Sequence, residues 1–225
     1  MSMGAYLIYF AILLIVPLWA QSKVKNTYKK YSKMPTSSLM TGEQVARKIL
    51  DDNGLFDVEI EKVKGVLSDH YDPRSKVVRL SSDNFHGHSM AASAVAAHEV
   101  GHAIQDAEEY AFLRFRSALV PVASFGSRIS IYILIAGIIF SLSNLILLGI
   151  IFMAAAVLFQ LVTLPVEFNA SSRAMDQLVG TGIIMNNEER ETKKVLDAAA
   201  LTYVAAALVA VAELMRFVLI FLSSD

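Results

Sequence analysis

Two histidines stand four residues apart in the segment AAHEVGHAIQ (96–105), and a glutamate directly follows the first of them. In a helix, residues four apart project from one face, so His98 and His102 can direct one ring nitrogen each at a common point. Zinc binds imidazole well, and a catalytic zinc site typically has three protein ligands and a position for water. Glu99 can take a proton from that water and pass it to a leaving amine. The spacing predicts a metal-activated hydrolase, provided that a third ligand exists. The alternative is an ordinary helix with two solvated or hydrogen-bonded histidines, which leaves the position of the glutamate unexplained.

The third ligand must be a histidine or a carboxylate, because the chain contains no cysteine. His70, His86 and His88 lie upstream of the motif, and acidic residues are available on both sides. No histidine follows His102, so a ligand from the downstream half would be a carboxylate, as in sites of two histidines and a glutamate. Glu167 is the leading candidate because it closely follows a long apolar stretch. An interfacial charge, or a residue favoured by a helix dipole, is the alternative.

The composition indicates a membrane protein that carries a water-soluble part. Hydrophobic residues make up 55% of the 225-residue chain and charged residues only 18%. Residues 5–20 and 129–164 are almost free of charge, whereas 21–117 has the mixed charges of a soluble domain. The formal net charge of −1 gives no support for nucleic-acid binding.

Basic residues predict how the apolar runs cross the membrane. The first run ends near Trp19 and is followed by a cluster of lysines, which marks its cytoplasmic end and favours an uncleaved anchor over a signal peptide. Residues 118–165 are long enough for a helical hairpin with its turn at SLSN (141–144), and basic residues flank the hairpin but not the turn. Both flanks should therefore face the cytoplasm and join one active site. Residues 198–222 are either a fourth crossing or a helix packed on the bundle.

Capping and alternation signals outline the soluble part. Thr41 and Gln44 form a capping-box pattern, and Ser89 can cap the helix that carries the two histidines. The predicted elements are helices 42–52 and 90–109 and strands 56–63 and 76–82. The strand at 76–82 is either an exposed edge that could bind an extended peptide or a buried central strand.

The expected fold class is α+β: a mostly helical, membrane-embedded protein with a zincin-like catalytic domain, a short sheet beside the metal-binding helix, and about four transmembrane helices. The predicted divisions are an N-terminal anchor at 1–21, a cytoplasmic zincin-like domain at 22–117, a transmembrane hairpin at 118–165, a cytoplasmic helix with the third ligand at 166–197, and a membrane-crossing or membrane-packed helix at 198–225.

Three stretches in this order resemble a known bacterial family. AAHEVGHAIQ, the later PVEFNASSRA and the upstream DHYDPRSKVVRLS are similar to the YugP-like neutral zinc metallopeptidases, and the similarity covers nearly the whole chain. That family is similar in layout to HtpX-type membrane proteases, in which membrane helices also divide a gluzincin site. The resemblance implies His98 and His102 as zinc ligands, Glu99 as the general base and Glu167 as the third ligand.

The resemblance also points to residues around the metal. Where better-known relatives often carry an acidic residue that orients a zinc histidine, this chain has Ser171, whose hydroxyl could accept the same hydrogen bond more weakly. Asn169 and Arg173 are candidates for substrate or transition-state contact, with Arg173 the better one. A structural ion pair or a lipid headgroup contact is the alternative for Arg173.

These observations predict a multi-pass protein of the cell membrane that holds one zinc ion per chain and hydrolyses peptide bonds with its active site facing the cytoplasm. Its expected partners are a protein or peptide substrate, membrane-associated or misfolded, and the lipid bilayer. A non-catalytic zinc-containing scaffold is one alternative, although Glu99 would have no purpose there. A hydrolase of lipid or other non-peptide esters is another.

Overall fold

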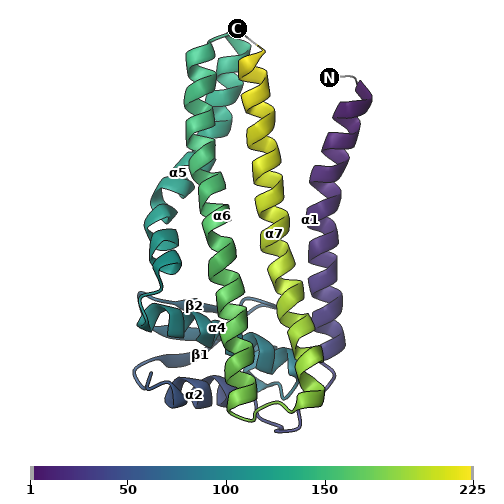
Figure 1. The fold of residues 1–225 in the computed structure, drawn as a ribbon, viewed down its shortest axis with the longest axis vertical. Coiled ribbons are helices and arrows are strands. Elements are labelled where there is room, and N and C mark those ends of the chain that lie inside the picture. The colour runs from purple at the N-terminus through teal and green to yellow at the C-terminus, as the bar shows by residue number, and fades with distance from the viewer. Residues whose placement is uncertain (1–2, 224–225) are drawn as a thin grey trace. The chain divides into compact units, whose positions relative to one another are not determined.

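The computed structural model describes residues 3–223, and helices dominate this part of the chain (Figure 1). The chain forms two compact units. One unit comprises residues 1–17, 111–165 and 203–225, and the other comprises 18–110 and 166–202. Residues 1–2 and 224–225, the outermost parts of the two predicted terminal segments, lie outside the described residues.

Among the described residues, four helices are long and apolar enough to cross a membrane, as the sequence predicts. They are α1 (Met3–Tyr31), α5 (Ala111–Ile139), α6 (Ser143–Gly180) and α7 (Asn186–Leu222). Their most apolar windows have few buried residues, from 6% of the window in α1 to 28% in α5. These exposed apolar side chains are suited to contact with lipid, because exposing so much apolar surface to water would cost free energy.

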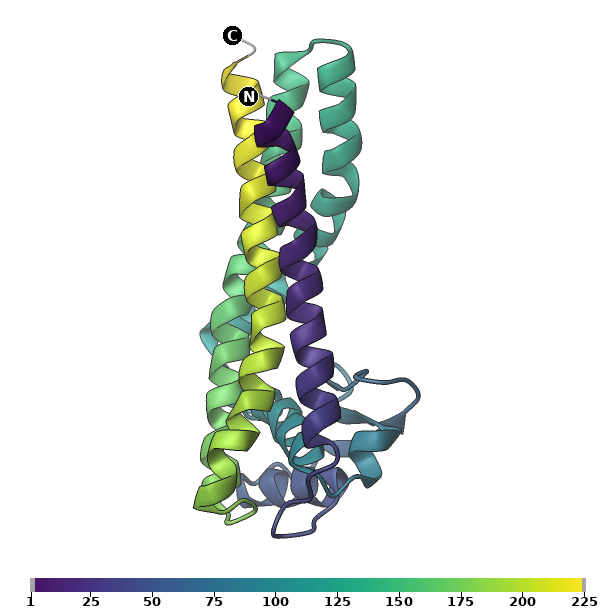
Figure 2. The same cartoon turned by 90° about the vertical axis from the view of Figure 1, so that its right-hand side faces the viewer.

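The first of the two units contains a tight helical hairpin, in which α5 and the first part of α6 run side by side (Figure 2). Glycines allow the close approach: a Cβ added at Gly126 would lie 2.7 Å from the carbonyl oxygen of Phe152, and one at Gly137 would lie 2.8 Å from the backbone nitrogen of Ile146. The turn at Phe140–Leu142 agrees with the predicted interruption at 141–144.

The second unit contains a small sheet with the order β1-β3-β2. Strand β1 (Glu59–Val63) pairs parallel to β3 (Val77–Ser81), and β2 (His70–Asp72) pairs antiparallel to β3. The strand at 76–82 is therefore central. Of the two alternatives for this strand, the exposed edge strand is wrong. Val77, Val78 and Leu80 are buried, which explains its run of apolar β-branched residues.

Helices α2 (Gly42–Asp52), α3 (Ser82–His86) and α4 (Met90–Ala107) belong to this unit, together with the sheet and parts of α1, α6 and α7. Both bonds of the predicted capping box are present, because Thr41 Oγ1 accepts from the Gln44 amide and Gln44 Oε1 accepts from the Thr41 amide. Ser89 Oγ accepts from the amide of Ala92 at 3.1 Å and so caps α4. The local signals are confirmed at these two helix starts.

The helix expected to begin near Glu167 is instead the second half of α6, which continues without a break through Pro165. A helix that ended at this point would leave its last backbone carbonyls without intrahelical partners, and continuing the helix pairs most of them. Residues 166–180 therefore belong to α6 and only 186–197 to α7. Glu167 thus has no helix N-terminus beside it, so a helix dipole does not explain its position.

Candidate metal centre

Three side chains from α4 and α6 converge in the second unit. Glu167 Oε2 lies 3.3 Å from His98 Nε2 and 3.6 Å from His102 Nε2. Among the described residues these three form the group that could hold a metal ion, with one ligand atom from each within 4.8 Å of the others. Their side chains are 13%, 12% and 4% exposed for His98, His102 and Glu167. The structure thus brings together the segments before and after the apolar hairpin, as the sequence predicts for one active site.

Close contact between α4 and α6 positions these ligands. A Cβ added at Gly101 would lie 2.6 Å from the carbonyl oxygen of Ala170, which is shorter than side-chain contacts allow. Gly101 sits one residue before His102, and Ala170 sits three after Glu167. The glycine in the motif is therefore required by the approach of the two backbones, despite its cost to helix stability.

We expect Gly101→Ala to destabilise the protein and loosen the site. Overpacking against a backbone atom costs about 1–3 kcal/mol, which exceeds the roughly 1 kcal/mol that alanine gains over glycine in a helix. The melting temperature in detergent and the affinity for zinc would both decrease. Gly180→Ala, for which the added Cβ meets nothing within 4 Å, is the control. Equal melting temperatures for the two variants would contradict this account of the packing.

The other ring nitrogen of each histidine has a polar neighbour. Ser171 Oγ lies 3.2 Å from His98 Nδ1, where it was expected to orient a zinc histidine. Gln105 Oε1 lies 3.0 Å from His102 Nδ1. Such partners hold the ring plane and leave Nε2 of each histidine directed at Glu167. The role of Ser171 stays a prediction, whereas Gln105 was not singled out from the sequence. Its spacing of three residues from His102, on one helix, was the available signal.

Glu99 directly follows His98 on α4, and its side chain is buried. Burial raises its pKa to about 7; His98 opposes this rise, and the negative charges of Asp69 and Glu167 add to it. The backbone of Tyr71, in β2, also opposes the rise in the pKa of Glu99. A carboxyl group with a pKa near neutrality can both accept and release a proton at neutral pH.

Asn169 and Arg173, the candidates for substrate contact, are bound to protein groups. Arg173 Nε donates to Asn169 Oδ1 at 2.8 Å, and its Nη2 lies 2.7 Å from Glu108 Oε2. Asn169 Oδ1 also accepts from Gln105 Nε2 at 2.9 Å. The arrangement includes the ion pair that was the alternative for Arg173, and contact with a substrate stays a prediction.

The upstream histidines that were weighed as ligands lie outside the cluster. His70 Nδ1 is 2.9 Å from the carbonyl oxygen of Ser68, and His88 Nδ1 is 2.9 Å from that of Leu39. His86 Nε2 is 3.5 Å from Lys62 Nζ. All three are exposed: His70 begins β2, His86 ends α3, and His88 lies in the loop before α4.

The donor set fits a zinc ion. Two imidazole nitrogens and one carboxylate oxygen form a ligand set typical of catalytic zinc, and all three groups are largely shielded from water. Lone pairs that face one another in a buried site repel unless a cation or a proton lies between them. A cation at the point of convergence removes that repulsion.

The class of protein follows from a comparison with known families. Residues 6–222 match the family described as "Putative neutral zinc metallopeptidase", so the chain belongs to it. The "Putative membrane protease YugP" of Bacillus subtilis (strain 168) is 56% identical over 205 residues, which are 91% of this chain and 91% of that protein. No solved structure is similar enough to count as a match. The family expected from the three sequence stretches is confirmed.

Proposed function

We propose that the protein is an integral membrane zinc-dependent endopeptidase with a zincin-like, gluzincin-type site. His98, His102 and Glu167 hold one zinc ion per chain, and Glu99 is the general base. The observation that carries this proposal is the convergence of the three ligand atoms from two helices, separated by a membrane hairpin in the sequence. The family assignment and the name of the Bacillus relative support the peptidase activity.

The residues around the metal have separate tasks in peptide hydrolysis. A bound zinc ion supplies Lewis acidity and lowers the pKa of water. The Glu99 carboxylate accepts the proton of the attacking water and returns it to the nitrogen of the leaving amine. Burial of Glu99 restricts the movement of its carboxylate during this transfer. Glu167 has no part in proton transfer, because its carboxylate is used as a ligand.

A peptide substrate would pair with β2, one of the two edge strands. Strand β2 is tied to α4 by the hydrogen bond from the Tyr71 hydroxyl to Asp106 at 2.9 Å, and the backbone of Tyr71 lies close enough to Glu99 to affect its pKa. The neighbouring β3 is paired on both sides and cannot accept a further strand. An extended peptide added along β2 would therefore pass beside the catalytic carboxylate.

The membrane location sets the substrate class. Four apolar helices and the membrane protease name of the relative support a multi-pass protein of the cell membrane. The lysines after the first apolar run and the basic flanks of the hairpin favour an active site at the cytoplasmic face. Membrane-associated or misfolded proteins are the substrates that such a site would meet.

Metal removal tests this proposal. We expect the full-length protein, purified in detergent, to contain about one zinc ion per chain and to cleave an unstructured protein such as casein. A chelator should abolish cleavage, and added zinc should restore it, because the proposed mechanism relies on the bound metal to activate the attacking water. Metal content by mass spectrometry and cleavage by gel electrophoresis provide the readouts.

The same experiment separates the alternatives. Zinc bound in equal amount, without cleavage of any unstructured protein tested, would favour a non-catalytic scaffold. Hydrolysis of lipid or aryl esters in the absence of peptide cleavage would favour an esterase. Protein that binds no zinc would overturn the proposal altogether.

A further inference from the structure

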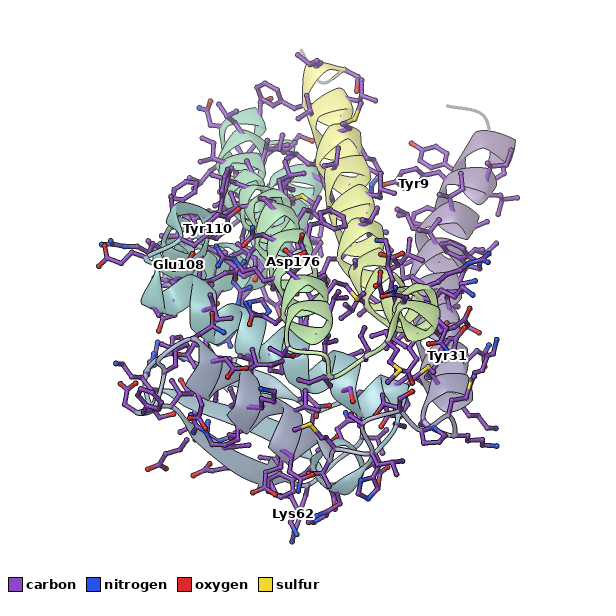
Figure 3. All side chains as sticks on the ribbon, turned by 60° about the horizontal axis from the view of Figure 1, so that its bottom comes forward. Tyr9, Tyr31, Lys62, Glu108, Tyr110 and Asp176 are labelled. Atoms are coloured by element: carbon purple, nitrogen blue, oxygen red, sulfur yellow. The ribbon has the colours of Figure 1, made fainter. Side chains whose placement is uncertain are left out.

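A buried chain of polar side chains connects one zinc ligand to an ion pair at the surface of the second unit. Its members are His102, Gln105, Asn169, Arg173 and Glu108. Gln105 is fully buried, while the carboxylate of Glu108, which directly follows α4 (Figure 3), is 57% exposed. Every contact in the chain lies between 2.7 and 3.0 Å.

The direction of each hydrogen bond follows from the chemistry of its members. A guanidinium has only donors, so Arg173 Nε must donate and the side-chain oxygen of Asn169 must face it. That oxygen can then only accept from Gln105, and the backbone carbonyl of Val166, 2.8 Å from Gln105 Nε2, can likewise only accept. The amide nitrogen of Gln105 must therefore point toward Val166 and Asn169, because both can only accept from it.

The orientation of Gln105 determines which ring nitrogen of His102 carries the proton. With its nitrogen held by two acceptors, Gln105 presents its carbonyl oxygen to His102 Nδ1 at 3.0 Å. An amide oxygen can only accept, so Nδ1 must be the protonated nitrogen. In a neutral imidazole the other nitrogen, Nε2, then has its lone pair free, and Nε2 is the atom that lies 3.6 Å from Glu167.

We infer that Gln105 is a positioning residue that locks His102 in the Nδ1–H tautomer, so that Nε2 is available to the metal. Asn169 and Arg173, held by Glu108, are the anchor that keeps the Gln105 amide in the required orientation. This inference rests on the proposed metal site and adds to it the group that prepares one ligand. It also assigns Asn169 and Arg173 a role through His102 in place of contact with the substrate.

The two histidines are held differently. Ser171 has a hydroxyl, which can donate or accept, so its contact with His98 does not by itself select a tautomer. Gln105 leaves His102 no choice, because both ends of the amide are determined. His102 is therefore the histidine whose tautomer is determined by its neighbours.

Histidine nitrogen NMR of the zinc-free wild type tests the tautomer without any variant. The chain has five histidines, and His102→Asn identifies the signal of His102. At a pH where the ring of His102 is neutral, we expect its one proton on Nδ1 and none on Nε2. A protonated Nε2 in the neutral ring would overturn the inference, whether or not the protein proves to be a peptidase.

Two variants of Gln105 separate positioning from structural support. In Gln105→Glu the carboxylate still accepts from His102 Nδ1 but no longer donates to Val166 and Asn169, whereas Gln105→Met loses every bond. We expect zinc affinity, measured by chelator competition, to decrease about 10–100-fold in Gln105→Met and far less in Gln105→Glu. A purely structural role predicts equal or greater loss in Gln105→Glu, which buries an extra charge. That result, or unchanged affinity in Gln105→Met, would refute the positioning role.

Arg173→Met distinguishes the anchor from a substrate contact. As an anchor, Arg173 should affect zinc affinity and the His102 tautomer signal, with little change in KM. A group that stabilises the transition state would instead lower kcat while zinc affinity and the tautomer signal stay as in the wild type. This second result would refute the anchor role.

Discussion

The Glu99→Gln variant should bind zinc as the wild type does and lose nearly all peptidase activity. Loss of a general base reduces turnover by about 10²–10⁴-fold, and glutamine has no basic oxygen that could take a proton from water. Glu99 is outside the group of three ligand atoms, so metal content should not change. The measurement is kcat and KM on an unstructured protein together with zinc content, and the decrease should lie in kcat.

A matched control isolates the role of position. Glu59→Gln makes the same chemical change at an exposed residue of β1 and should leave both zinc content and cleavage unaltered. If Glu99→Gln cleaves at the wild-type rate, the general base is another group and a different mechanism must be considered. If Glu99→Gln loses zinc, its carboxylate is a ligand and the assignment of Glu167 is open.

The sequence predicted those parts of the fold that local interactions determine. The starts of α2 and α4 depend on capping side chains within three residues, and both agree with the structure. The central position of β3 could not be read from its own sequence, because β-branched runs occur in both edge and central strands. Its two neighbours, β1 and β2, are chosen by tertiary packing.

The candidate site also has a part that could be predicted from the sequence and a part that could not. The four-residue spacing of His98 and His102 and the membrane hairpin before Glu167 were readable signals, and the structure brings these residues together. The interactions that orient them were not readable, since the Gln105 bonds to Val166 and Asn169 cross from α4 to α6. Helix α6 also passes through Pro165, where a local proline signal favours a break.

Loss of the Glu167 carboxylate should remove the metal. We expect Glu167→Gln to reduce zinc affinity by more than about 100-fold, since even partners that merely orient a ligand are worth 10–100-fold. An amide keeps the size of the side chain but has no negative charge, so the two histidines alone would remain as strong ligands. Glu167→Ala should have a similar or larger effect. Chelator competition followed by metal analysis measures both variants.

Asp176→Asn provides the control for this prediction, because Asp176 is an exposed carboxylate on the same helix, α6 (Figure 3). It should keep full zinc affinity. Folding is checked separately in the absence of metal by comparing the thermal unfolding of the zinc-free Glu167→Gln variant and the zinc-free wild type, because Glu167 is 3% exposed between two histidines. Full zinc affinity in Glu167→Gln would mean that the third ligand lies elsewhere, and the convergence of α4 and α6 would then serve packing alone. Reduced zinc affinity with intact zinc-free folding would instead tie the apolar hairpin to metal binding, because the hairpin is the segment of chain that leads from the two histidines to Glu167.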